Sequence, residues 1–206
     1  MAITIRQATV DDAPFLAQMI LQSSRAGKKE GLFDLAFGTN DTVSVLQNLE
    51  KLTLTESKSH CHYKNFLIAL MDDKPVGTLC SYEPRIATHD AFLNALEEIG
   101  FSESHELMDV LQECDFNLNK RTLMFDFMEE LEGFIDVGVL KALMQKSLLT
   151  ARLKGYTIAQ TIIEIGSLET ELFYKKLGFN VVKQKECELY KERFGRSGLM
   201  LLATEF

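Results

Sequence analysis

Apolar residues recur along the chain with two spacings, and these spacings predict the strands and helices of a mixed sheet. Short apolar runs typical of strands lie at residues 3–6, 64–71, 76–82, 121–131, 157–163, 179–182 and 199–203. Apolar residues three or four apart predict helices after residue 12 and over 42–52, 137–154 and 168–177. This order predicts an α/β architecture (an α+β mixed sheet) in which helices flank a central sheet.

Turn and cap residues mark the ends of several elements. Residues 72–75, Asp-Asp-Lys-Pro, predict a hairpin turn between the second and third strands. Gly155 and Gly178 stand where a glycine ends a helix, and Ser167 stands where a serine begins one. Residues 25–41 are glycine-rich and irregular, so we expect a loop there with at most a helical turn.

Residues 83–120 differ from their surroundings because they are acidic and helix-forming. Apolar residues recur at helical spacing over 92–99 and again over 107–111. We interpret the chain as a single domain of residues 1–206 with a helical insertion at 83–120, between the third and fourth strands. Two roles remain open for the insertion, a lid over a substrate or a homodimer contact.

Composition excludes several classes of protein. The 206 residues are 46% hydrophobic and 25% charged, which is typical of a water-soluble globular domain. No apolar run approaches the about 20 residues that a membrane helix needs, and no signal peptide is apparent, so we expect a cytoplasmic protein without a membrane partner. The 30 acidic and 22 basic residues give a net charge of −8, which argues against a nucleic-acid partner.

The cysteines and histidines do not predict a metal site. The four cysteines are far apart and form no C-x-x-C pair: Cys61, Cys80, Cys114 and Cys187. His60 and His62 would share one face if they lay on a strand, but no third ligand is apparent. We therefore expect reduced thiols and no bound metal.

Three segments together resemble the GNAT superfamily of N-acetyltransferases. Residues 5–16 (IRQATVDDAPFL) are similar to its opening strand and helix, and residues 67–77 (LIALMDDKPVG) to its second and third strands. Residues 142–179 are similar to its cofactor half and end in FYKKLGF. The resemblance covers the chain outside the insertion. It implies a GNAT-like acyl-CoA N-acyltransferase fold, with a mostly antiparallel central sheet and acetyl-CoA between the splayed fourth and fifth strands.

The family's diphosphate loop, Q/R-x-x-G-x-G/A, aligns with residues 135–140 and is degenerate here. Gly138 keeps the central glycine, whereas Ile135 replaces the usual Arg or Gln and Leu140 replaces a small residue. Backbone amides at a helix N-terminus bind phosphate whatever the side chains are. The resemblance implies cofactor contacts from Leu131, Val137, Gly138, Val139, Leu140, Lys141 and Ser167.

Acidic side chains surround this loop. Five of them fall within eleven residues without a basic residue among them: Asp126, Glu129, Glu130, Glu132 and Asp136. Two like charges about 4 Å apart repel by about 4 kcal/mol at an effective dielectric constant of 20. The sequence therefore predicts weakened binding of a cofactor that carries several negative charges.

The catalytic candidates follow from the same resemblance. Tyr174 matches a tyrosine that serves as general acid toward the CoA thiolate in many family members, and the alternative is an aromatic that fills the core. Glu129 and Glu130 are candidates for the base, or are edge acids without a role.

Strand alternation would send the two glutamates to opposite faces. It would place Glu129 with Phe125 and Phe127, and Glu130 with Asp126 and Met128. One of the two would then face the acceptor amine.

Residues 31–34 (GLFD) and 82–84 (YEP) resemble segments of one bacterial GNAT subgroup. The resemblance implies that Phe33, Asp34, Tyr82 and Glu83 line the acceptor side. The leading hypothesis is an acetyl-CoA-dependent N-acetyltransferase that acts on a primary amine of a small molecule or peptide in a ternary complex. One alternative is a GNAT-fold binding or regulatory module with weak or lost acetyl-CoA binding, and another is an enzyme that uses a longer acyl-CoA.

Overall fold

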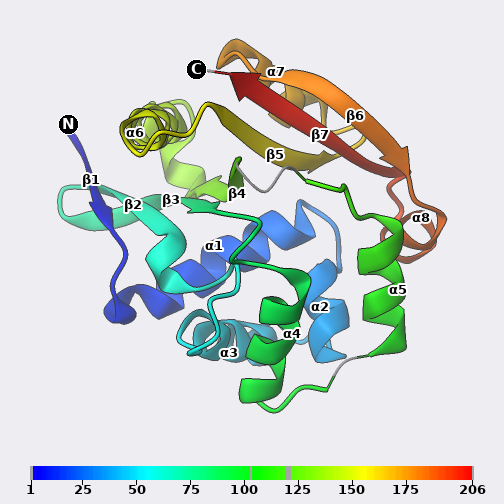
Figure 1. Cartoon of the computed structure of the whole chain (residues 1–206). Coiled ribbons are helices and arrows are strands. Elements are labelled where there is room, and N and C mark those ends of the chain that lie inside the picture. Colours follow the sequence, from blue (N-terminus) through cyan, green and yellow to red (C-terminus); the bar gives the residue numbers. More distant parts are fainter. Residues whose placement is uncertain (1, 103, 119–121, 206) are drawn as a thin grey trace.

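The computed structural model describes residues 2–102, 104–118 and 122–205 (Figure 1). Over these residues seven strands form one sheet in the order β1-β2-β3-β4-β5-β7-β6. Neighbouring strands are antiparallel except β4 and β5, which are parallel. The strands are β1 (Ile3–Gln7), β2 (Phe66–Met71), β3 (Lys74–Tyr82), β4 (Leu123–Glu130), β5 (Ile158–Glu164), β6 (Asn180–Glu186) and β7 (Gly198–Glu205).

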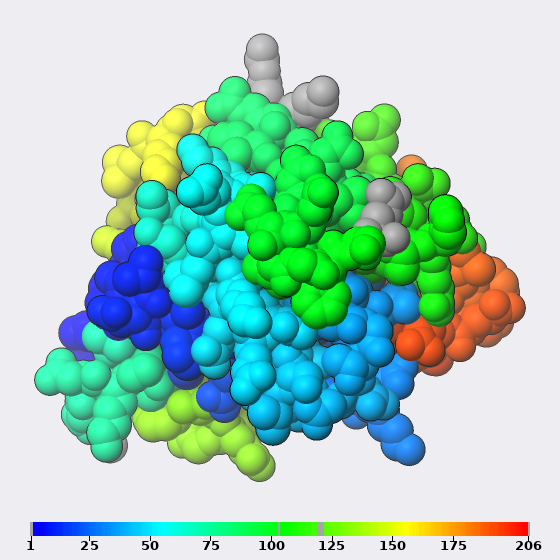
Figure 2. Space-filling view, turned by 90° about the horizontal axis from the view of Figure 1, so that it is seen from below, coloured from blue at the N-terminus to red at the C-terminus, as the bar shows by residue number. Residues whose placement is uncertain are grey.

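Helices cover both faces of the sheet. They are α1 (Ala13–Arg25), α2 (Leu32–Phe37), α3 (Thr42–Thr53), α4 (His89–Glu98), α5 (His105–Glu113), α6 (Val139–Leu153), α7 (Leu168–Lys176) and α8 (Glu188–Phe194). Helices α6 and α7 lie on one face and α1 to α5 on the other, while α8 follows β6 at the far end (Figure 1). From below, α3 and α4 cover much of the second face (Figure 2). Each face buries its own hydrophobic core.

The predicted fold class is confirmed, with three local differences. Helix α2 is longer than the turn expected in the loop at 25–41, and α8 was not predicted. Helix α8 has seven mostly charged residues, of which only Phe194 is buried, so its sequence carries little apolar periodicity. Strand β4 begins at Leu123, and position 121, the expected first residue of that strand, lies outside the described residues.

The hairpin between β2 and β3 has the predicted turn. Asp72 and Asp73 both have left-handed backbones, with φ of 50° and 60°. Two such residues in succession form a tight turn that matches the twist of antiparallel strands.

Strand β4 contains a bulge that reverses part of its alternation. Cys80 of β3 pairs with Asp126 and Thr78 with Glu129, so β4 has one residue more than β3 between these pairs. Phe127 takes up the difference with φ of 45°. The extra residue makes Asp126 and Phe127 face the same side.

This bulge corrects the predicted grouping along β4. Phe125 packs in the core beneath α6 and α7, whereas Phe127 packs in the opposite core with α1 and α2. Glu129, whose carboxylate meets Gln22 of α1, therefore shares a face with Phe127 but not with Phe125. Met128 packs against the α6 core, on the side of Phe125 and away from Asp126.

Gly77 lets α6 lie close to the sheet. A Cβ atom at this position would be 2.6 Å from Cγ1 of Val139 and 2.9 Å from the carbonyl oxygen of Glu129. Both distances are shorter than van der Waals contact, so only glycine allows the first turn of α6 to pack across β3 and β4.

We predict that Gly77→Ala lowers the free energy of unfolding by about 1–3 kcal/mol, because the added methyl group overpacks this contact. Urea unfolding followed by circular dichroism measures the change. Gly133→Ala is the matched control, since a Cβ there meets no atom within 4 Å, and its effect should stay within about 0.5 kcal/mol. Equal stability of the two variants would show that the packing of α6 does not depend on Gly77.

Candidate active site

The parallel strands β4 and β5 separate in the middle of the sheet. Among the described residues they pair only over Leu123–Phe125 and Ala159–Thr161, although β4 continues to Glu130 and β5 to Glu164. Beyond these pairs the facing strand edges have backbone N–H and C=O groups that do not bond across the sheet. Such groups need partners, so the split between the strands suits an extended ligand that contains amides.

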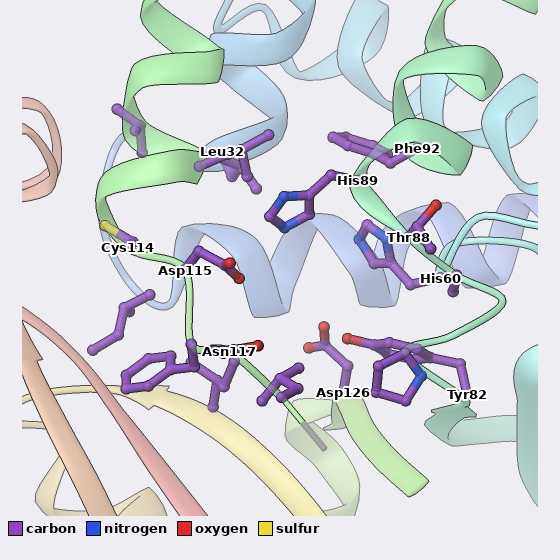
Figure 3. A pocket seen from close by; sticks show the side chains of 18 of the residues that line it. Leu32, His60, Tyr82, Thr88, His89, Phe92, Cys114, Asp115, Asn117 and Asp126 are labelled. Atoms are coloured by element: carbon purple, nitrogen blue, oxygen red, sulfur yellow. The ribbon is translucent and has the colours of Figure 1, made fainter. Parts of the chain in front are cut away.

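A cavity of about 520 Å³ lies on the α1–α5 side of this split. Four neighbouring strands supply its floor through Tyr82 of β3, Asp126 of β4, Ile162 of β5 and Leu199 of β7. Most of its walls come from helices α4 and α5 (Figure 3). The segment between β3 and α4 and the segment after α5 complete these walls. The cavity thus lies where β4 and β5 begin to separate.

Asp126 is the carboxylate at the floor of this cavity. The pKa of Asp126 is raised to about 6, mainly by burial and also by the nearby charge of Glu129. The backbone N–H of Phe127, at the bulge, donates a hydrogen bond of 2.8 Å to Oδ1 and partly opposes this shift. A carboxylate with a pKa this close to neutrality is suited to take up a proton during a reaction.

Other polar side chains converge on the cavity. His60, His89, Asp115 and Tyr82 point into it together with Asp126 (Figure 3). Burial, and to a lesser degree His89, lowers the pKa of His60 to about 4, so its imidazole is neutral at physiological pH. Burial raises the pKa of Tyr82 well above its usual value, and Asp126 contributes to that shift.

A cluster of charged side chains lies at the end of β5, beside α8. The buried carboxylate of Glu164, at the end of β5, forms ion pairs with Lys28 and Arg196. It also accepts a hydrogen bond of 2.7 Å from the hydroxyl of Tyr190 in α8. These contacts tie the segment after α1 to β5 and α8.

Tyr174, the predicted general acid, lies on the opposite face at the same split. It is 3% exposed on α7, and its ring packs edge-on against Phe179 at 5.1 Å between centroids. Thr161, the last residue of β5 that pairs with β4, donates a hydrogen bond of 3.4 Å to the phenol oxygen of Tyr174. Burial raises the pKa of Tyr174, and the charges of Asp126 and Glu129 add to the shift, so the hydroxyl stays protonated near neutral pH.

The two glutamates predicted as the base lie on opposite faces of β4. Oε2 of Glu129 accepts a hydrogen bond of 2.7 Å from Gln22, and burial raises the pKa of Glu129. Burial also raises the pKa of Glu130, while hydrogen bonds from the backbone N–H groups of Leu140 and Asp136 lower it. Neither glutamate lines the cavity; Asp126 does.

The predicted diphosphate loop forms the start of α6. Gly138 precedes the helix with φ of 94°, and Val137 is exposed. The side chain of Val139 is fully buried and that of Leu140 packs against the same core, so both point away from a ligand. Lys141 is exposed. A ligand at this site would meet backbone amides and Lys141.

Of two other predicted cofactor contacts, Leu131 has a structural role and Ser167 does not form the predicted cap. The backbone N–H of Leu131 donates to the carbonyl oxygen of Val76 across 2.9 Å. Ser167 precedes α7 as predicted, but its side chain makes no cap hydrogen bond. Its hydroxyl therefore does not stabilise the helix in the expected way.

The start of α6 already holds an oxyanion. The carboxylate of Glu130 lies beside the N–H groups of Leu140 and Asp136, which lower its pKa. The N–H group of Leu140 is the kind of donor that phosphate oxygens use at a helix N-terminus. The site therefore fits a phosphate group by its backbone chemistry. A diphosphate would have to displace the Glu130 carboxylate and would also meet the charge of Asp136.

The predicted acceptor-side residues are divided between several places. Tyr82 lines the cavity, whereas Glu83 faces a second cavity of about 340 Å³ and pairs with Arg85. Phe33 is 2% exposed and packs behind the cavity wall against Phe92 and Phe127.

Asp34 is buried below the surface of α2. Its carboxylate accepts hydrogen bonds from Arg25 at 2.7 and 3.1 Å and from the backbone N–H of Gly31 at 2.7 Å. These contacts hold α2 to α1 and occupy Asp34 in a structural role.

Sequence reasoning missed Asp126, His60 and His89 as residues of one site. Asp126 was counted only among the acids near the loop, and nothing local to the sequence signals the bulge that aims it into the cavity. His60 and His62 do not share a face, because the segment before β2 is not a strand and the two rings line different cavities.

Two of the distant cysteines meet in the fold. Sγ of Cys114, Sγ of Cys187 and a carboxylate oxygen of Glu113 all lie within 4.8 Å of one another. The Glu113 carboxylate accepts the backbone N–H groups of Glu188 and Leu189 at 3.0 and 2.8 Å, so it caps the start of α8. Long-range folding, which the spacing of the cysteines does not encode, brings these groups together.

No helix in the described part of the chain is long and apolar enough to cross a membrane.

Neither a protein-family model nor a curated protein matches the sequence. Solved structures do match it. An N-acetyltransferase from Staphylococcus aureus Mu50 aligns with 98% of this chain and 100% of its own at a TM-score of 0.73 and 16% identity. The PaiA N-acetyltransferase from Thermoplasma acidophilum, solved in complex with coenzyme A, covers 100% of both chains at a TM-score of 0.56 and 12% identity.

A GNAT-family acetyltransferase from Staphylococcus aureus Mu50 covers 99% of both chains at a TM-score of 0.57 and 14% identity. These likenesses cover 98–100% of the chain. They confirm the fold that the three resembling segments predicted. This chain therefore has the fold of the GNAT N-acetyltransferases.

Proposed function

We propose that this protein is an acetyl-CoA-dependent N-acetyltransferase that transfers the acetyl group directly to a primary amine in a ternary complex. One observation carries the proposal: Asp126 and Tyr174 reach the split between β4 and β5 from opposite faces of the sheet. Burial raises the pKa of each group, which makes the first a base and keeps the second a proton donor. The names of the structural neighbours support the same reaction class.

The chain offers places for both ends of the cofactor. Acetyl-CoA, when bound, supplies a thioester whose carbonyl carbon accepts the amine and whose sulfur leaves as a thiolate. The free strand edges beyond Phe125 and Thr161 would hold the amides of the pantetheine arm. The amides at the start of α6 would hold the diphosphate once Glu130 releases Leu140, with Lys141 beside them.

Asp126 and Tyr174 account for the protons. The Asp126 carboxylate first attracts the ammonium form of the acceptor and then takes a proton from it, so the nitrogen lone pair becomes available. The N–C bond would form as the C–S bond breaks, and Tyr174 would donate a proton to the departing thiolate. The nitrogen would then lose its second proton to water, and Asp126 would release the first proton to solvent. Solvent returns the proton to the phenolate.

One observation favours a second function, a binding or regulatory module. Glu130 occupies the anion site of α6, and Asp136 lies close enough to raise the pKa of Glu130. If these acids exclude the diphosphate, the fold would serve recognition without transfer. The affinity for acetyl-CoA separates the two functions.

We predict micromolar binding of acetyl-CoA that weakens with salt, and binding that is about tenfold tighter in Glu130→Gln. The substitution removes the charge that competes for the amide of Leu140, and tenfold corresponds to about 1.4 kcal/mol. Isothermal titration calorimetry at low and moderate salt measures both proteins. Glu132→Gln is the control, because Glu132 is exposed and no hydrogen bond of its side chain to this amide is found among the described residues. Absence of binding up to millimolar cofactor in all three proteins would favour the module.

For the base, we predict that kcat/KM rises with pH around a value near 6 and that Asp126→Asn lowers kcat by about 100-fold or more. The substitution keeps an oxygen for the N–H of Phe127 but cannot accept a proton. An acetylation assay from pH 5 to 9 measures both effects. A similar pH profile in Asp126→Asn would assign the titration to another group.

Stability provides a control for Asp126 that does not depend on activity. The native pKa lies above the ordinary value of 3.8, so the native state holds this proton more tightly than the unfolded state. This contribution is complete below about pH 4 and is lost as pH rises through about 6. Asp126→Asn should therefore be about 3 kcal/mol more stable than the wild type at pH 8, from about two pKa units at about 1.4 kcal/mol each, and nearly as stable as the wild type at pH 4.

For the acid, we predict that Tyr174→Phe lowers kcat far more than it lowers cofactor affinity. The ring and its contact with Phe179 remain, and only the hydroxyl that acts on the leaving sulfur is lost. Steady-state kinetics together with calorimetry separate the two quantities. Equal losses in both would mean that Tyr174 serves only to pack the core.

A further inference from the structure

We propose that the acceptor is a small amine with one positive charge and a hydrophobic group, held in the cavity that the 83–120 insertion builds beneath the split of β4 and β5. This inference rests on the proposed function for its chemistry. The choice of acceptor class rests on the charge, the walls and the size of the cavity.

The charge of the cavity selects a cation. Its described lining contains three aspartates, Asp90, Asp115 and Asp126, and no lysine or arginine. Figure 3 shows Asp115 and Asp126 pointing into the space from opposite sides. His60, the more buried of the two histidines in the described lining, is neutral at physiological pH. It therefore does not offset the negative charge of the aspartates. An ammonium group near Asp126 would supply the opposite charge that a recessed carboxylate lacks.

The walls select a hydrophobic group. Leu32 of α2, Phe92 of α4, and Val110 and Leu111 of α5 face the same space. Figure 3 shows Leu32 and Phe92 across the cavity from Asp126. An acceptor with its amine at Asp126 would therefore place its carbon skeleton among these apolar side chains, which favours an arylalkyl or branched alkyl amine over a strongly hydrated one.

The dimensions favour a small molecule. A volume of about 520 Å³ falls in the range of sites that enclose a ligand of drug size. The cluster of Glu164, Lys28 and Tyr190 ties the end of β5 to the segments beside it, so an extended peptide would meet paired side chains there.

This assignment gives the insertion a role. Most of the lining lies between Pro84 and Leu118, including residues of α4, α5 and the chain after each of β3 and α5. Without these elements the cavity would lack most of its walls. Of the two roles left open by the sequence, the structure favours the cover over the acceptor.

The test measures binding before turnover. 2-Phenylethylamine and isoamylamine represent the proposed class. Spermidine represents the polyamines, a tetrapeptide with a free N-terminus represents the peptides, and 2-phenylethanol represents uncharged hydrophobic ligands. Calorimetry without cofactor gives the affinity of each compound for the full chain, and an acetylation assay with acetyl-CoA follows. We expect the two hydrophobic monoamines to bind at least about tenfold more tightly than the other three, because only they satisfy both the charge and the walls.

Two variants locate the site. Leu111→Ala should weaken the binding of 2-phenylethylamine by about tenfold and leave that of methylamine unchanged, because only the larger amine reaches this wall. Gln112→Ala, on the same helix but exposed and outside the cavity lining, should change neither affinity. Asp126→Asn should weaken the binding of both amines.

The outcomes separate the two proposals. Hydrophobic monoamines that bind best and are acetylated support both, and such amines that bind best without acetylation support this inference and overturn the proposed function. Preferred binding or acetylation of spermidine or the tetrapeptide overturns this inference and leaves acetyl transfer standing. Absence of amine binding, or binding unchanged in Leu111→Ala, also overturns the inference.

Discussion

The short pairing between the parallel strands β4 and β5 is the constraint on which the site depends. After the Phe125–Thr161 pair the two strands no longer share hydrogen bonds, although each continues toward its neighbour on the other side, β3 or β7. The sheet is thereby opened at its centre, between two strands that each remain paired on their other side. Helix α6 can remain close to β3 and β4 only because Gly77 has no side chain, and this contact sets where the first turn of α6 meets the split.

The two faces of the sheet bring different chemistry to that split. On the α6 and α7 side, apolar packing around Tyr174 and Phe179 keeps a phenol protonated. On the other side, the bulge at Phe127 turns Asp126 into the cavity. The backbone N–H group of Phe127 holds the Asp126 carboxylate there. Both pKa shifts have burial as their largest cause, so the same exclusion of water prepares a donor on one face and an acceptor on the other.

Negative charge has opposite consequences at the two ends of the site. In the cavity, the aspartates would attract the proposed cationic acceptor, and their apolar surroundings would strengthen the attraction. At the start of α6, Glu130 and Asp136 would oppose the diphosphate of the proposed acetyl-CoA, because the Glu130 carboxylate lies beside the amide of Leu140. The long side chain of Glu130 can move away from that amide, whereas the helix amides themselves stay in place. Under the proposed function, the affinity for acetyl-CoA would therefore depend on how readily this carboxylate is displaced.

Most of the elements and their order follow from the amino-acid sequence, because the spacing of apolar residues and turn chemistry are local properties. Helix α8 does not, since its residues are mostly charged. The Asp72-Asp73 turn, the strand at 66–71 and the motif that ends at Phe179 could be predicted for this reason, and with them the GNAT fold. Which acid faces the cavity depends on long-range packing. Asp126 reaches it through one extra residue in β4, and the left-handed backbone of Phe127 is imposed by packing between two cores, for which no neighbouring residue gives a signal. His60 and Asp126 are 66 positions apart in the chain and meet in one cavity because four strands and an insertion are folded around it.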